Sequence, residues 1–134
     1  MARILLTHTP EMRANYYGAR ALAGLEALGD VVRHEGSEPL AGEALVAAAR
    51  GCRAMVADRV TAVPEGVLDA LPDLAAVVRV AVDIRNIDVE AASRNGILVT
   101  QASRTWVPAV TELAVGLMID AARGISRANI AYKQ

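Results

Sequence analysis

Residues 74–100 read LAAVVRVAVDIRNIDVEAASRNGILVT, and two short apolar runs in this stretch flank a helix-forming segment. The runs at 74–80 and 97–100 are typical of strands buried on both faces of a sheet. Between them, Asp88 can cap the first turn of a helix over 88–95, and Gly96 can end that helix. A strand, a helix and a second strand in this order predict a β-α-β unit of a parallel sheet.

The same alternation extends toward the N-terminus. Further strands are predicted at 3–7, 30–33 and 53–57, and further helices at 11–28, 43–50 and 64–71. Five short strands alternating with helices predict an α/β fold, with helices on both faces of a five-stranded parallel sheet. Right-handed crossovers and a flavodoxin-like strand order of 2-1-3-4-5 are the natural closure for this length.

A long helix is predicted over 107–123, with Pro108 in its first turn and Gly124 after its end. Its apolar residues wrap around most of the helix and do not form a single stripe. We therefore predict two parts, a flavodoxin-like domain over 1–106 and a long apolar helix with its tail over 107–134. Because such a helix needs cover on more than one side, we also expect a homo-oligomer built through residues 107–125.

Composition excludes several classes of protein. The 134 residues carry 14 basic and 15 acidic side chains without a basic stripe, so neither nucleic acid nor a membrane surface is an expected partner. No apolar run reaches membrane-spanning length and no signal peptide is recognised, so we expect a cytoplasmic protein. Cys52 is the only cysteine, and it is interpreted as a packed core thiol. Neither this thiol nor the two histidines predict a metal site.

Three loops carry the candidate binding residues. Ligands of parallel sheets bind beyond the carboxyl ends of the strands, where the loops at 7–9, 58–59 and 81–86 are expected to meet. Arg59 and Arg85 are the best anion-binding candidates, although each taken alone is equally well a solvated loop arginine. His8 lies at the same edge, and a solvated loop histidine is favoured over a substrate contact.

The sequence resembles a known family in three places. Residues 78–92, VRVAVDIRNIDVEAA, are similar to the "GVGVDNIDLEAA" segment of the D-isomer-specific 2-hydroxyacid dehydrogenases, which include phosphoglycerate dehydrogenase. Residues 56–61 resemble the family's "VRSAT"-like loop, and 95–100 with 110–114 resemble its "GI-V-N-P…VAEL" passage. The resemblance implies the N-terminal substrate-binding (catalytic) domain of an NAD(P)-dependent oxidoreductase that acts on a 2-hydroxy or 2-oxo acid.

The resemblance also implies a substrate site, in which backbone N–H groups of a glycine-rich loop hold the substrate carboxylate. Here Ala81 and Asp83 replace the two glycines of that loop, and Arg85 replaces its aspartate. Asp83 brings a negative charge to the site, and Arg85 either offsets that charge or itself binds the anion. The residues predicted to bind substrate are Arg59, Ala81, Val82, Asp83, Arg85 and Asn86.

The family's catalytic Arg, Glu and His follow its dinucleotide fingerprint and have no counterpart in this sequence. There is no G-x-G-x-x-G between a strand and a helix, and Gly18 and Gly24 are interpreted as packing glycines inside a helix. We therefore expect a fragment or truncated form that binds no cofactor and cannot transfer hydride alone. The alternatives are a stand-alone small-carboxylate binding or regulatory module that lost its redox domain, and an unrelated flavodoxin-like domain.

Overall fold

The computed structural model describes residues 1–133, and the chain divides into two compact units, Met1–Ala102 and Ser103–Gln134. The first unit holds ten helices and strands in alternating runs. In chain order they are β1 (Ala2–Leu6), α1 (Pro10–Tyr16), α2 (Ala19–Glu26), β2 (Gly29–Arg33), α3 (Gly42–Ala49), β3 (Ala54–Ala57), α4 (Glu65–Asp69), β4 (Ala76–Arg79), α5 (Val89–Arg94) and β5 (Leu98–Thr100).

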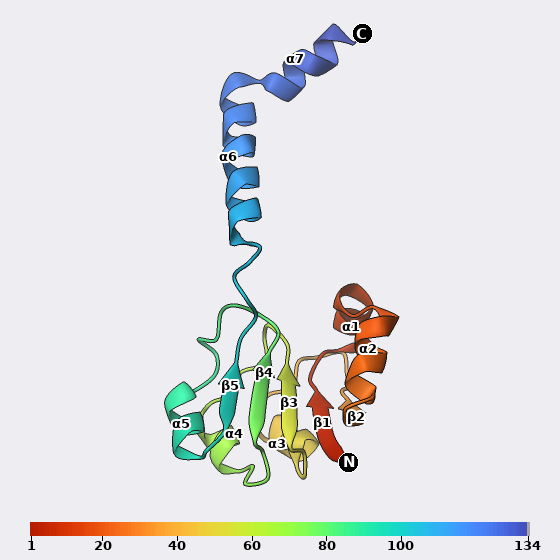
Figure 1. The fold of residues 1–134 in the computed structure, drawn as a ribbon, viewed down its shortest axis with the longest axis vertical. Coiled ribbons are helices and arrows are strands. Elements are labelled where there is room, and N and C mark those ends of the chain that lie inside the picture. The colour runs from red at the N-terminus through yellow and green to blue at the C-terminus, as the bar shows by residue number, and fades with distance from the viewer. Residues whose placement is uncertain (134) are drawn as a thin grey trace. The chain divides into compact units, whose positions relative to one another are not determined.

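The five strands form one sheet in the order β2-β1-β3-β4-β5, and every neighbouring pair is parallel. The predicted flavodoxin-like order 2-1-3-4-5 is therefore confirmed. Because the strands are parallel, their carboxyl ends share one edge of the sheet (Figure 1). The loops that carry the candidate residues all leave from this edge.

Helices cover both faces of the sheet, and alternate residues of each strand pack on opposite sides. Leu5, Met55 and Val77 belong to the larger core cluster, which also contains residues of α3, α4 and α5. Ile4, Leu6 and Val56 form the smaller cluster, which contacts Tyr17 and the α2 residues Leu22 and Leu25. Cys52 is fully buried in the larger cluster, so the predicted core thiol is confirmed, and burial raises the pKa of that thiol.

The single helix predicted over 11–28 is wrong, because the segment forms two helices. Tyr17 has an extended backbone (φ −115°, ψ 114°), and Gly18 is the N-cap of α2. The break turns the Tyr17 ring onto His8, with 4.9 Å between the ring centroids. The interpretation of Gly18 and Gly24 as packing glycines is also wrong, since a Cβ at either position would meet nothing within 4 Å.

The second unit contains α6 (Val107–Arg123) and a helix that was not predicted, α7 (Ile125–Tyr132). Gly124 ends α6 in the left-handed region at φ 64°, as its position after the apolar run predicted. The Asp120 carboxylate accepts the backbone N–H of Ser126 at 2.6 Å, which satisfies an amide of the first turn of α7. Among residues 1–133, no helix combines the length and the hydropathy needed to cross a membrane.

Candidate functional site

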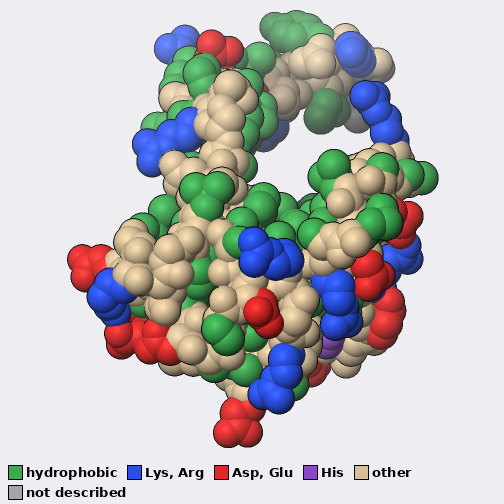
Figure 2. Space-filling model, turned by 60° about the horizontal axis from the view of Figure 1, so that its bottom comes forward, with side chains coloured by type: hydrophobic (Ala, Val, Ile, Leu, Met, Phe, Trp, Pro, Cys, Tyr) green, Lys and Arg blue, Asp and Glu red, His purple; other side chains and the backbone are tan. Residues whose placement is uncertain are grey.

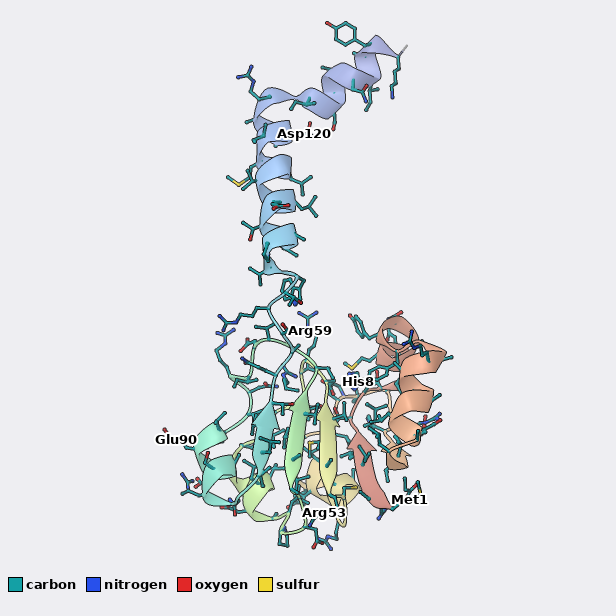
Figure 3. All side chains as sticks on the ribbon, in the orientation of Figure 1. Met1, His8, Arg53, Arg59, Glu90 and Asp120 are labelled. Carbon is teal, nitrogen blue, oxygen red and sulfur yellow. The ribbon has the colours of Figure 1, made fainter. Side chains whose placement is uncertain are left out.

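The candidate site is the edge of the sheet at the carboxyl ends of the strands. Figure 3 places His8 and Arg59 at this edge, and Met1 and Arg53 at the opposite one. Figure 2 brings forward the side of the molecule that lies at the bottom of Figure 1, where acidic and basic side chains are interspersed. The balanced composition provides no basic or acidic block, so the chemistry of the candidate edge depends on a few local charges.

Asp58 follows β3 and is 1% exposed. Its Oδ2 accepts the hydroxyl protons of Thr7, at 2.6 Å, and of Thr61. Its Oδ1 accepts the backbone N–H groups of Val60, at 2.7 Å, and Thr61, at 2.9 Å. Burial alone would raise the pKa of this carboxyl, but the four hydrogen bonds outweigh it and hold the pKa below its usual value. Asp58 is thus an ionised structural anion that binds the loop after β3 to the end of β1.

Arg79, at the end of β4, was missed by the sequence analysis. Its side chain is 5% exposed, and its Nε donates to the Asp83 carbonyl at 3.0 Å. Its Nη2 donates to the Arg59 carbonyl at 2.8 Å, while Nη1 is buried without a partner among the described residues. Burial lowers the pKa of this guanidinium, and the nearby Asp58 and Asp83 carboxylates oppose that shift. The sequence did contain a signal for it, because Arg79 is a charged residue inside the run 74–80 that was predicted to be buried.

Asp83 and Arg85 form an ion pair within the loop after β4. The Arg85 Nε lies 2.9 and 3.0 Å from the two carboxylate oxygens of Asp83, and Nη2 lies 2.7 Å from Oδ2. These hydrogen bonds from Arg85 hold the pKa of the Asp83 carboxyl well below its usual range. Arg85 therefore pairs with Asp83, while its predicted binding of a substrate anion stays a prediction.

Asn86 connects the loops that follow β3 and β4. Its Nδ2 donates to the Thr61 carbonyl at 2.6 Å, and its backbone carbonyl accepts the Val63 N–H at 2.8 Å. Val63 in turn accepts the Asp88 N–H at 3.0 Å, which completes an isolated parallel bridge between Val63 and Ile87. Asn86 thus connects the two loops, and its predicted contact with substrate stays a prediction.

The backbone N–H groups of residues 82–84 point to a different role for that part of the loop. Within the described residues they donate to no carbonyl or side chain. Ala81 and Val82 are half-buried, and the Ala81 carbonyl is held by the N–H of Ala102 at 3.0 Å. A fixed loop with several consecutive free N–H groups is suited to accept an anion.

His8 is buried, with 2% of its surface exposed, so the predicted solvated loop histidine is wrong. The Tyr17 ring and α1 cover it, and its Nδ1 has no partner among the described residues. Burial lowers the pKa of His8, which favours the neutral ring. Asp58 acts against this shift, while Arg13 and Arg79 add to it. Across residues 1–133, no three His, Cys, Asp or Glu side chains are grouped to hold a metal ion.

Comparison with known proteins identifies the family of the chain. Residues 4–131 match the model of the D-isomer specific 2-hydroxyacid dehydrogenase, catalytic domain. The chain belongs to this family. It is 34% identical over 114 residues to D-3-phosphoglycerate dehydrogenase of Methanocaldococcus jannaschii, which covers 85% of this chain and 21% of that protein. The chain therefore spans about a fifth of that relative's length.

Solved structures show the same fold. The PH0520 protein from Pyrococcus horikoshii is 25% identical, with a TM-score of 0.72 over 96% of this chain and 36% of that one. The glyoxylate/hydroxypyruvate reductase of Sinorhizobium meliloti, solved with NADP and malonate, is 24% identical. Its TM-score is 0.62, over 89% of this chain and 34% of that chain.

Proposed function

We propose that residues 1–102 form the substrate-binding part of an NAD(P)-dependent oxidoreductase of 2-hydroxy and 2-oxo acids. The observation that carries this proposal is the row of free N–H groups at 82–84, next to a loop pair with an excess of positive charge. The two loops, residues 58–61 and 79–87, together contain three arginines and two carboxylates, so their net charge is positive. The arginines are Arg59, Arg79 and Arg85, and the carboxylates are Asp58 and Asp83. A substrate carboxylate would accept hydrogen bonds from these N–H groups and would be attracted by the excess positive charge.

Within this site each predicted residue has a proposed role. The backbone at Ala81, Val82 and Asp83 supplies N–H donors, and Asn86 keeps their loop in place through Thr61. The exposed Arg59 supplies the positive charge that pairs with the ligand, because the guanidinium of Arg85 already donates to Asp83. Residues 1–134 lack a glycine-rich phosphate loop, so we assign no part of them to NAD(P) and propose that hydride transfer needs residues outside this set.

Malonate is a suitable probe, since it is a small dicarboxylate and is present in the Sinorhizobium meliloti structure. We expect saturable malonate binding, and we expect Arg59→Ala to weaken it about tenfold, because one charge-assisted contact is lost. Calorimetric titration measures both affinities. Arg94→Ala is the matched control, because Arg94 pairs with Glu65 on α4 and should leave binding unchanged. Equal affinity in wild type and Arg59→Ala would remove Arg59 from the site.

Asp83→Asn is expected to increase malonate affinity about three- to tenfold, because it removes a competing carboxylate and frees Arg85. The same titration measures the gain. Adding Arg85→Ala to Asp83→Asn should cancel it, since the freed guanidinium is then absent. A gain that persists in the double variant would mean that Asp83 acts only through its own charge.

A stand-alone carboxylate-binding module is the second candidate function. The Asp83–Arg85 pair favours it, because these two residues replace a glycine and an aspartate of the loop that the dehydrogenases of this family carry. For either function we propose a homo-oligomer formed through residues 107–125, because α6 leaves large apolar side chains such as Leu113, Leu117 and Met118 exposed.

A further inference from the structure

Side-chain hydrogen bonds, called tethers below, join neighbouring strand ends of the sheet. Arg13 on α1 donates to the carbonyls of His8, at 2.8 Å, and His34, which follow β1 and β2. The Thr7–Asp58 hydrogen bond joins the ends of β1 and β3. Arg79 joins the loops after β3 and β4, through two different nitrogens of one guanidinium.

Arg79 differs from the other tethers because it is a buried cation, only 5% exposed. A buried cation is expensive unless it is well paired; the two hydrogen-bond acceptors of Arg79 are neutral carbonyls, and the nearby Asp58 and Asp83 carboxylates offset only part of the cost of burial. Stability alone therefore does not explain an arginine here, since a well-packed apolar side chain in such a place is often equally stable. Only an arginine has a planar guanidinium that can donate hydrogen bonds to two fixed carbonyls at once; an apolar side chain or a lysine cannot do this.

The two carbonyls belong to the residues that carry the proposed anion site. One is the carbonyl of Arg59, whose side chain supplies charge, and the other is the carbonyl of Asp83, in the middle of the free N–H groups at 82–84. Holding these two backbones fixes how far apart the side-chain donor and the backbone donors lie. Binding sites lose affinity when such groups are misplaced by about an ångström or less.

We propose that Arg79 is the positioning residue of this edge, whose guanidinium holds the backbones of Arg59 and Asp83 at the spacing that one carboxylate ligand requires. The inference rests on the proposed function for the ligand, although the clamp itself can be measured without any ligand. Arg79 acts through the two loops, and the contacts to the anion come from Arg59 and from residues 82–84.

The first measurement is amide exchange in ligand-free protein. The amides of Val63 and Asp88 bridge the two loops, and the amide of Leu98, bonded to the Ala75 carbonyl, serves as a reference outside them. In Arg79→Met and Arg79→Lys, exchange at Val63 and Asp88 should accelerate by about tenfold or more, while Leu98 exchanges as in wild type. Acceleration in both variants shows that the fork, and not the charge, holds the loops.

The second measurement separates positioning from a general loss of structure. Arg79→Ala leaves a space for a small cation, so millimolar methylguanidinium should restore malonate affinity, while methylammonium should not. Without the added cation, malonate should bind about tenfold more weakly than to wild type. Arg94→Ala with and without methylguanidinium controls for general effects of the salt, because Arg94 lies in a surface ion pair.

Two results would overturn the inference: loop amides of Arg79→Lys that exchange as in wild type, or a rescue by methylammonium equal to that by methylguanidinium. If an Arg79 variant fails to fold, the Leu98 amide loses its protection together with the loops, and Arg79 is then a core stabiliser only. If wild type binds no malonate, the proposed function fails, and the exchange comparison still decides whether Arg79 clamps the loops.

Discussion

Asp58→Ala is expected to lower the free energy of unfolding at neutral pH by about 3–5 kcal/mol. The substitution removes the common acceptor of four hydrogen bonds and leaves two hydroxyls and two N–H groups without it, in a place where Asp58 is 1% exposed. Each buried polar group left unsatisfied costs about 1–3 kcal/mol, and a methyl group restores none of the bonds. Urea denaturation followed by circular dichroism measures the loss.

Asp58→Asn is the matched control, because it keeps the shape and one acceptor oxygen but removes the charge. Asp58→Asn should lower the free energy of unfolding by less than Asp58→Ala does. Thr7→Val should lower it by less again, since that change leaves the Thr61 hydroxyl and both N–H donors bonded to Asp58. A loss below about 1 kcal/mol in Asp58→Ala would show that water replaces the carboxylate.

The same carboxylate fixes the sign of the pH dependence. Since the pKa of Asp58 is lower in the folded than in the unfolded protein, its stabilisation is complete above the unfolded value of about 4. That stabilisation is lost as the pH falls through the folded pKa, because the proton then binds to both states. Stability should therefore fall less steeply below about pH 4 in Asp58→Asn than in wild type.

The features of the fold that were predictable are those with a local cause. The positions of the strands followed from short apolar runs separated by residues such as Gly96, which has φ 67° and ends α5 without strain from a side chain. The position of Arg59 and of 81–86 at one edge also followed, because parallel strands bring all carboxyl ends together. Neither inference required knowledge of which side chains touch.

The contacts of the edge were not predictable, because they join residues far apart in the chain. Arg79 and Arg59 are 20 residues apart, and Thr7 and Asp58 are 51 apart. The sequence predicts a solvated His8 because nothing near it in the chain shows that Tyr17 would cover it, after a helix break that Asn15 and Gly18 were too weak to signal. For Arg85, the sequence left two roles open, and the observed hydrogen bonds show only that its guanidinium pairs with Asp83.

Light scattering at micromolar concentration is expected to give at least twice the chain mass of 14.1 kDa. The reason lies in α6, whose large apolar side chains are between 40% and 71% exposed. They are Val107, Val110, Leu113, Val115, Leu117, Met118 and Ile119. An exposed apolar patch of several hundred Å² is unusual for a monomer. At about 25 cal/mol per Å², covering ~400 Å² contributes on the order of 10 kcal/mol before the costs of association.

Leu117→Glu tests this surface, because Leu117 is 59% exposed and a buried carboxylate at a subunit contact is costly. The variant should shift the scattering mass toward 14.1 kDa and keep the circular dichroism of the folded chain. Glu112→Gln, at an exposed polar residue of the same helix, is the control and should leave the mass unchanged. A second copy of the chain is the occupant we propose, since a closed two-fold contact covers the same apolar surface on both subunits at once. A wild-type mass of one chain, with Leu117→Glu equally soluble and equally stable, would show that α6 needs no second copy.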